Sequence, residues 1–257
     1  MKNKSLGFIG GGRITRIFLQ ASKNKSINLE NISVYEPDAG NMDRLLELYQ
    51  EIKAAGSPEN AAQQEVVILA VHPPMIMDSL NRIKEVVNSG TIILSFAPKF
   101  TTAKIADVLP TRKIMRMIPN ATSFSNDGYN PVAFGRDFPA EEKDNILEIF
   151  SHMGETFEVD ESKLEGYAIY SAMLPTYFWF QWKKLEELAV KTGLTKDEAA
   201  RAIRDTIYKS AGLLYDSGLS YDEVVDLIPV KPIGDHEEEI RKIYETKLIG
   251  LFEKIKP

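Results

Sequence analysis

Three consecutive glycines near the start of the chain are the residues with the clearest chemistry. They follow the apolar run Leu6–Ile9 and precede apolar residues at helical spacing, so we expect a strand to turn sharply into a helix here. Such a turn exposes backbone N–H groups and the positive end of a helix dipole, and glycine leaves room for a phosphate to approach. We therefore expect a dinucleotide pyrophosphate to bind at Gly10, Gly11, Gly12, Arg13 and Ile14.

An acidic residue, Glu36, ends the second expected strand, about 25 residues after the glycines, as the dinucleotide-binding fingerprint requires. A carboxylate there accepts hydrogen bonds from the adenosine ribose and repels a 2′-phosphate, so the sequence favours NADH over NADPH. The preference for NADH stays open, because Arg13 or Arg44 can offset the charge of Glu36. The glycine motif itself departs from the usual fingerprint at Thr15, which replaces its third Gly or Ala. The structural alternative is that Glu36 is a solvated acid at a strand end.

Loops that follow the neighbouring apolar runs supply the remaining expected cofactor contacts. Ligands of open α/β sheets bind beyond the carboxyl ends of the strands, where these loops lie. The residues we expect to contact the cofactor there are Asn60, Ala70, Val71, His72, Pro73 and Ala97.

Strands and helices alternate from the first residue to about Leu109, which is typical of a doubly wound α/β sheet of the Rossmann type. The strongest expected strand, Glu65–Val71, is a continuous apolar run, as in a parallel strand covered on both faces. A helix over Pro139–Met153, between short strands at Pro131–Gly135 and Thr156–Val159, extends the same pattern. We expect the sheet to position the glycine turn and the loops together.

The pattern becomes helical after Asp160. A long helical stretch is expected over Lys163–Lys191, interrupted only at Pro175, and a second long helix over Thr195–Tyr215 that begins with a capping box. Shorter helices are expected over Ser220–Leu227 and His236–Ile255. The sequence therefore predicts two domains, a dinucleotide-binding domain at 1–160 and an all-α domain at 161–257.

Composition excludes several classes of function. The chain has 257 residues, no cysteine, three scattered histidines and a net charge of −6, so we expect no disulfide, no metal centre and no nucleic-acid surface. No stretch approaches the roughly 20 apolar residues of a membrane span. We expect a cytoplasmic protein.

Motifs in both halves resemble the pyrroline-5-carboxylate reductase family. That family has G-F-I-G-x-G-x-M, A-V-K-P and M-P-N at its strand ends, where this chain has Gly7–Gly12, Ala70–Pro73 and Ile118–Asn120. In the helical half, Ala189–Leu194 is similar to the family's A-x-K-x-G-L, and Ser210–Gly218 to its G-A-x-x-L and S-G. The resemblance covers nearly the whole chain.

The resemblance implies an oxidoreductase that uses NAD(P)H to reduce a carbon–nitrogen double bond, in proline biosynthesis if the family's activity is kept. It also implies a dimerising helical domain, so we expect a homodimer or a higher homo-oligomer. The dense aromatic residues of Tyr177–Trp182 suit a subunit interface.

The departures from the family concentrate where the substrate should bind. The family's S-G-S-G-P-A-Y is Ser171–Tyr177 here, with both glycines lost, and its S-P-G-G-T-T is Lys231–His236, with Asp and His in place of two threonines. An acid is unfavourable beside a substrate carboxylate. His72 and Lys99 also replace the family's Lys and Gly. We infer a different imine or a related small acceptor as the substrate.

Hydride transfer needs orientation and a proton, and no single residue stands out as the proton donor. Resemblance places Asn120 near the nicotinamide. The candidate catalytic residues are Asn120, Tyr177, Lys231 and His236.

Two other functions remain open. A 3-hydroxyacid-type dehydrogenase has the same two-domain plan but needs a lysine four residues after a glycine, where Tyr170 follows Gly166. A non-catalytic dinucleotide sensor or scaffold is the second, because the substrate loops are altered.

Overall fold

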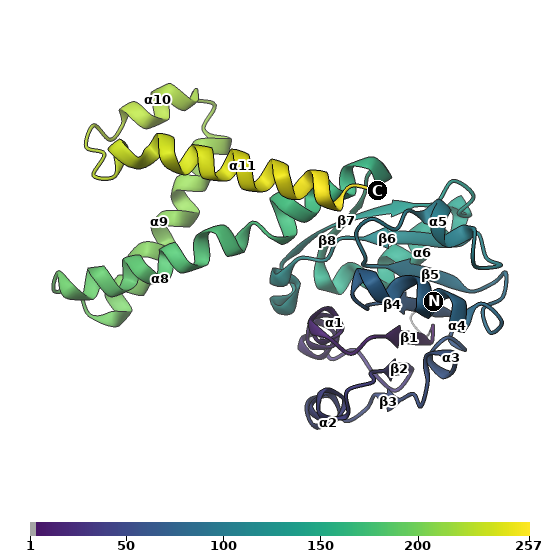
Figure 1. Ribbon diagram of the computed structural model, residues 1–257. Helices are drawn as coiled ribbons and strands as arrows, with labels where there is room; N and C mark the ends of the chain where they lie inside the picture. Colours follow the sequence, from purple (N-terminus) through teal and green to yellow (C-terminus); the bar gives the residue numbers. More distant parts are fainter. Residues whose placement is uncertain (1–3) are drawn as a thin grey trace. The chain divides into compact units, whose positions relative to one another are not determined.

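Eight strands form one sheet in the order β3-β2-β1-β4-β5-β6-β7-β8, in a computed structural model that describes residues 4–257 (Figure 1). Residues 1–3 of the first predicted domain lie outside the described residues. Neighbouring strands are parallel except for β6 and β7, which are antiparallel. The strands are β1 (Leu6–Ile9), β2 (Ile32–Tyr35), β3 (Lys53–Ala54), β4 (Val66–Leu69), β5 (Ile92–Ser95), β6 (Ile114–Met117), β7 (Gly128–Phe134) and β8 (Gly154–Glu158).

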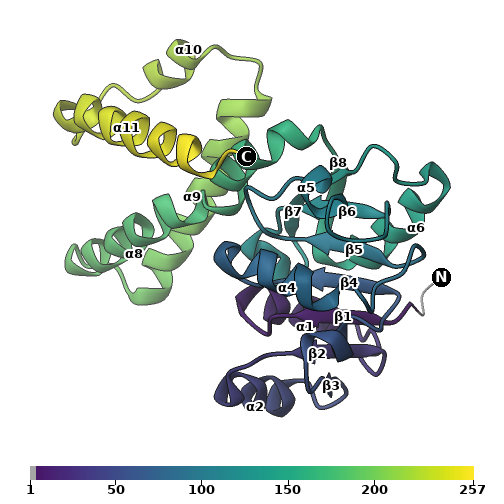
Figure 2. The same ribbon diagram turned by 45° about the vertical axis from the view of Figure 1, so that its right-hand side comes forward.

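Helices follow most of the parallel strands and return the chain to the next one. Polar side chains start several of them, since Asp38, Ser57 and Thr101 each accept a hydrogen bond from a first-turn N–H. The helices up to β8 are α1 (Arg13–Asn24), α2 (Ala39–Leu48), α3 (Pro58–Ala61), α4 (Ile76–Ile83), α5 (Thr102–Ala106) and α6 (Ala140–Phe150). In the turned view of Figure 2, β2, β1, β4, β5 and β6 follow one another as neighbours, with the switch in strand order at β1 and β4.

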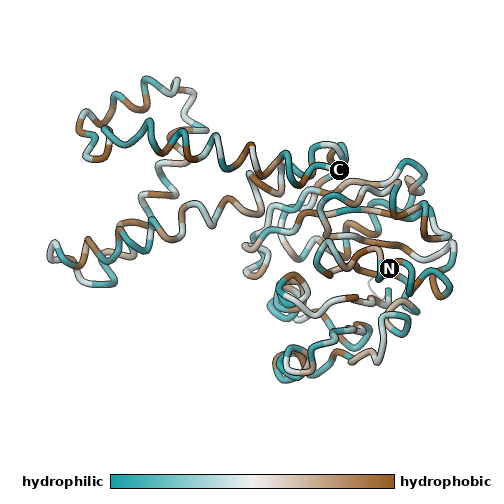
Figure 3. Tube along the Cα trace, viewed as in Figure 1, coloured by the Kyte–Doolittle hydropathy of each residue, from teal (hydrophilic) through white to brown (hydrophobic). Residues whose placement is uncertain are grey.

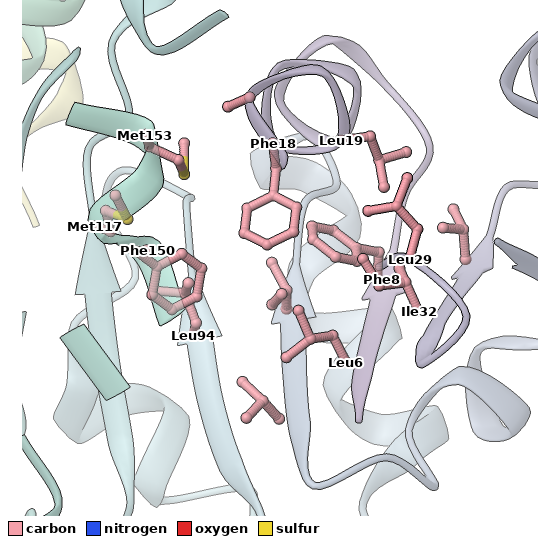
Figure 4. Close-up of a cluster of buried hydrophobic side chains, with 14 of the residues drawn as sticks. Leu6, Phe8, Phe18, Leu19, Leu29, Ile32, Leu94, Met117, Phe150 and Met153 are labelled. Carbon is pink, nitrogen blue, oxygen red and sulfur yellow. The ribbon is translucent and has the colours of Figure 1, made fainter. Parts of the chain in front are cut away.

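Alternating side chains of the central strands bury two hydrophobic layers, one on each face of the sheet. Phe8 and Ile68 point toward α1, α2 and α6, while Ile9 and Val67 point toward α3, α4 and α5. On the first face the ring centroid of Phe18 lies 5.1 Å from that of Phe8 and 5.7 Å from that of Phe150 (Figure 4). The strands are apolar throughout because both faces are covered. The predicted doubly wound sheet is confirmed.

The helical half contains α7 (Leu164–Tyr167), α8 (Pro175–Lys191), α9 (Lys196–Asp216), α10 (Tyr221–Asp226) and α11 (Glu237–Ile255). The long helix expected over Lys163–Lys191 is interrupted by a π-helical segment, Ala168–Ala172. Pro175 then starts α8, where its missing N–H costs nothing. The capping box at Thr195 is present: Thr195 and Glu198 each accept a hydrogen bond from the other's backbone N–H.

The chain divides into two compact units, one up to Ala172 together with Phe252–Pro257, and the other over Met173–Leu251. The first unit extends beyond the boundary expected near Asp160, because Leu164 and Ala168 are buried with Ile118 and Ala133. In the second unit, α8 packs along α9. None of the helices within residues 4–257 has the length and apolar character that crossing a bilayer requires.

Candidate dinucleotide-binding site

The glycine turn joins β1 to α1 as the sequence predicts, and two of its glycines lie too close to neighbouring residues for a side chain. Gly10 has a φ of 108°, and a Cβ there would lie 2.5 Å from the carbonyl oxygen of Ala70. A Cβ on Gly11 would lie 2.8 Å from Cβ of Glu36. Gly12 is the N-cap of α1 and has no capping side chain, so the first N–H groups of the helix have no side-chain acceptor there.

Thr15, which departs from the glycine motif, stabilises the glycine turn through its hydroxyl, a role that the sequence does not indicate. The side chain is fully buried, and Oγ1 donates a hydrogen bond of 2.6 Å to the carbonyl oxygen of Gly10. The hydroxyl therefore closes the turn across five residues, where the usual fingerprint has a small residue for close packing.

A pocket of about 710 Å³ lies at the carboxyl ends of the strands, beside the glycine turn. It brings together nine of the twelve residues expected to bind the cofactor: Gly11, Gly12, Arg13, Ile14, Ala70, Val71, His72, Pro73 and Ala97. Gly10, Glu36 and Asn60 do not line it. This is the edge at which open α/β sheets bind nucleotides, next to the switch point between β1 and β4.

Glu36 holds the glycine turn from the side. One carboxylate oxygen accepts a hydrogen bond of 2.8 Å from the N–H of Gly11, and the other accepts one of 3.0 Å from the N–H of Asp38. A carboxylate has about four acceptor positions, so both oxygens keep capacity for a further donor. Glu36 thus has a neighbour that the sequence did not suggest, the backbone of the glycine turn itself.

Arginines line the same pocket near the start of α1 and in α2. Arg16, Arg44 and Asn41 join Arg13 there, while Glu47 is the acidic residue of the lining. Sequence reasoning named Arg13 and Arg44 as residues that offset Glu36, and it missed Arg16 and Asn41. Their helical spacing from the glycine turn and from Asp38 is the signal that would have found them.

Asn60 lies in the first turn of α3, where Ser57 is the N-cap, and it is not among the residues that line the pocket. The Oγ of Ser57 accepts a 3.2 Å hydrogen bond from the N–H of Asn60 and also donates to its side-chain oxygen. The pair starts the short helix α3, which packs against β1 and β2.

Asn120 is almost fully buried, and its polar groups are engaged within the first unit. Its side-chain nitrogen donates to the carbonyl oxygen and to Oγ of Ser171, both at 3.2 Å. Its side-chain oxygen accepts from the N–H and the hydroxyl of Thr122, and its own N–H donates to Asn130. Asn120 therefore ties the end of β6 to the π-helical segment that contains Ser171.

The other three candidate catalytic residues belong to the second unit. Tyr177 lies on α8 with its ring centroid 6.3 Å from that of Tyr244 on α11. Lys231 and His236 are exposed and share one turn, in which the N–H of Gly234 donates to the carbonyl oxygen of Lys231. His236 lies 3.7 Å from the carboxylate of Glu239. Among the described residues, no cluster of three or more potential ligand residues could hold a metal ion.

The doubly wound sheet, the glycine turn and the pocket define a Rossmann-type dinucleotide-binding protein with a helical second half. Comparison with known proteins agrees. A family model described as NADP oxidoreductase, coenzyme F420-dependent, matches residues 5–99.

Similarity to individual proteins extends over nearly the whole chain. The pyrroline-5-carboxylate reductase of Methanosarcina acetivorans is 25% identical, covering 98% of this chain and 94% of its own. The NADP-bound pyrroline carboxylate reductase of Plasmodium falciparum is 21% identical, with a TM-score of 0.79 over 99% of this chain and 96% of its own. A pyrroline-5-carboxylate reductase from Coxiella burnetii, 24% identical, has a TM-score of 0.71 over 98% of this chain and 94% of its own. The predicted resemblance to this family is confirmed.

Proposed function

We propose that the chain is an NAD(P)H-dependent reductase of a small cyclic imine, with the conversion of pyrroline-5-carboxylate to proline as the first activity to test. The observation that carries the proposal is the pocket, which gathers the glycine turn and the loops after β4 and β5 at one edge of the sheet. The near full-length similarity to pyrroline-5-carboxylate reductases supports the same reaction class. We place the enzyme in the cytoplasm, as we expect from the sequence.

The chain's own residues would mainly bind the cofactor and the substrate and orient them for hydride transfer. A reduced nicotinamide, when bound, supplies a hydride, and an imine that arrives protonated needs no strong acid from the protein. The open N–H groups at Gly12 and the first turn of α1 suit a pyrophosphate, and the loop after β5 forms another wall of the pocket. Asn120, Tyr177, Lys231 and His236 stay the proposed catalytic residues.

We favour NADH as the cofactor because of Glu36. Its carboxylate lies against the N–H of Gly11, beside the turn where the ribose should bind, and a negative charge there repels a 2′-phosphate. Arg13, Arg16 and Arg44 act in the opposite direction, since each cation lines the pocket and attracts a phosphate. The preference therefore depends on which charge lies closer to the 2′ position.

We also propose a homodimer or a higher homo-oligomer assembled through the second unit. Within residues 173–251, Ala199 is the one buried residue, and hydrophobic residues recur along the helices (Figure 3). Phe180 is 68% exposed and Tyr208 is 73% exposed. Exposed apolar surface of this extent marks a surface that associates with another chain. Light scattering should give twice the chain mass of 28.9 kDa or more, and Phe180→Glu should lower that mass.

The proposed activity is tested by mixing the protein with NADH or NADPH and a panel of cyclic imines, with 2-oxo and 3-oxo acids as controls for a dehydrogenase. Cofactor oxidation that depends on an imine supports the reductase. The altered substrate segments at Ser171–Tyr177 and Lys231–His236 favour the second candidate function, a dinucleotide sensor. Tight cofactor binding without turnover of any substrate would favour that sensor.

A further inference from the structure

A fully buried arginine, Arg116, lies near the carboxyl end of β6. Its guanidinium contacts Glu165 on α7 at 2.5 Å and Glu161 at 3.1 Å, and it also donates to the carbonyl oxygen of Ala97 at 3.4 Å. Arg116 is 0% exposed and Glu165 is 1% exposed. A buried charge requires such partners, because an unpaired guanidinium in the interior is strongly unfavourable.

Both carboxylates also accept hydrogen bonds from the segment that follows β5, which comprises the loop 96–101 and Thr102, the first residue of α5. Glu165 accepts a hydrogen bond of 3.4 Å from the N–H of Lys99. Glu161 accepts one of 2.7 Å from the N–H of Thr102 and one of 2.9 Å from its hydroxyl. The loop is therefore held at both ends and in its middle, and every one of these attachments leads to Arg116.

This loop is one wall of the candidate cofactor pocket. Phe96, Ala97 and Pro98 line the pocket, and Lys99 follows directly with a φ of 71°, a left-handed conformation that is unfavourable for a lysine. Such a conformation persists only where the surroundings enforce it. The hydrogen bond from Lys99 to Glu165 is one contact that does so.

The order of the strands indicates which half of a dinucleotide this wall would meet. Glu36 and the arginines lie beyond β2 and the start of α1, on the side expected for the adenosine. β4 and then β5 follow on the other side of β1, so the loop after β5 lies toward the nicotinamide half.

We propose that Arg116, Glu165 and Glu161 form a positioning network that fixes the loop after β5 against the nicotinamide half of the cofactor. This inference rests on the proposed dinucleotide-dependent function. The three residues act through the backbone of residues 97–102 and do not contact the cofactor themselves.

The network has a cost that a purely stabilising role does not explain. Within the described residues, Nε of Arg116 and the second carboxylate oxygen of Glu165 are both buried without a hydrogen-bond partner. Well-packed apolar residues often replace buried ion pairs without loss of stability. What apolar residues could not supply is the set of acceptors for the N–H groups of Lys99 and Thr102.

The test uses the full chain with the substitution Glu165→Gln. Glutamine has nearly the same shape as glutamate but carries no charge. Binding of NADH is compared with binding of ADP-ribose, which lacks the nicotinamide. We expect the variant to bind NADH about tenfold more weakly, the size expected for loss of one charged hydrogen bond, and to bind ADP-ribose as the wild type does. Glu142→Gln is the matched control, because Glu142 pairs with Lys113 next to the same strand and away from this loop.

Equal losses for NADH and ADP-ribose, or no loss for either, would overturn the inference. Hydrogen exchange of the free protein gives a second readout: the amide of Lys99 should exchange faster in Glu165→Gln and at the wild-type rate in Glu142→Gln. Unaltered exchange at Lys99 in Glu165→Gln would also overturn the inference. A wild-type protein that binds neither NADH nor ADP-ribose would instead overturn the proposed function, while the exchange result still decides whether the network holds the loop.

Discussion

The carboxylate of Glu36 accepts a hydrogen bond of 2.8 Å from the backbone N–H of Gly11, so the acid that ends β2 is joined directly to the glycine turn that ends β1. The same carboxylate also holds the N–H of Asp38 at the start of α2. One side chain therefore fixes the turn and places a negative charge beside it, which links the shape of the turn to the choice of cofactor.

Replacing Glu36 by alanine should lower the affinity for NADH while the affinity for NADPH holds or rises. The variant loses an acceptor for ribose hydroxyls and a charge that repels a 2′-phosphate, and it leaves three arginines in the pocket lining. The change for NADH should be about tenfold, the size of one charged hydrogen bond. Fluorescence titration with both cofactors measures it. Equal losses for NADH and NADPH would show that Glu36 acts on the turn alone.

Gly10→Ala should destabilise the fold by at least about 2 kcal/mol, because alanine is unfavourable at a positive φ and its Cβ would collide with the carbonyl oxygen of Ala70. Gly12→Ala is the matched control, since a Cβ there meets no atom within 4 Å. Its free energy of unfolding should stay within about 1 kcal/mol of the wild type. Urea denaturation compares the two variants, and equal stability would contradict the close approach at Gly10.

Thr15→Val should cost about 1 to 2 kcal/mol of folding free energy and weaken dinucleotide binding. Valine has the shape of threonine but cannot donate the 2.6 Å hydrogen bond to the carbonyl oxygen of Gly10, and the site is fully buried. Thr15→Ser keeps the hydroxyl and should bind the cofactor more tightly than Thr15→Val does. The reverse order in a binding titration would assign the effect of Thr15 to its methyl group.

Much of the fold follows from the sequence, and the reasons are local. The apolar runs Val66–Leu69 and Ile92–Ser95 predict covered parallel strands, and the three glycines with Glu36 place the turn and the acid correctly. The interruption of the long helix at Ala168–Ala172 was not predicted, because the hydrophobic spacing continues through it.

The contacts that join distant segments could not be predicted. Arg116 lies in a weak strand pattern and meets Glu165 from a helix 49 residues later. The family resemblance places Asn120 near the nicotinamide, whereas its hydrogen bonds to Ser171 depend on how β6 meets the π-helical segment. Patterns in a single sequence indicate hydrophobic periodicity and helix caps. Contacts between residues far apart in the chain are determined only by how the whole first unit packs.

The stability of the protein should fall as the pH falls, with His152 as one cause. Burial lowers the pKa of His152, while hydrogen bonds to the backbone of Ile149 and Phe18 act in the other direction. Below the ordinary histidine pKa of about 6.5, His152 is protonated in the unfolded chain but still neutral in the folded chain. The free energy of unfolding is therefore highest above this pKa and decreases below it.

The variant His152→Gln isolates this effect, because it removes the imidazole and leaves every other titratable group of the chain in place. The stability difference between wild type and variant should shrink as the pH is lowered from about 7 to about 5, by at most about 1.4 kcal/mol per pH unit. Thermal or urea unfolding across this range measures it. Parallel curves for the two proteins would mean that His152 titrates alike in the folded and unfolded states.

Transfer of deuterium from NADH or NADPH that carries deuterium at both positions of the nicotinamide C4 tests the central claim most directly. The protein is incubated with the labelled cofactor and pyrroline-5-carboxylate or another cyclic imine, and the amine product is analysed by mass spectrometry. The proposed function predicts a single deuterium on the former imine carbon of each product molecule formed. If the cofactor binds but every imine tested gives either no amine product or a product without deuterium, the protein is not an imine reductase. It would then be a dinucleotide-binding protein without this chemistry.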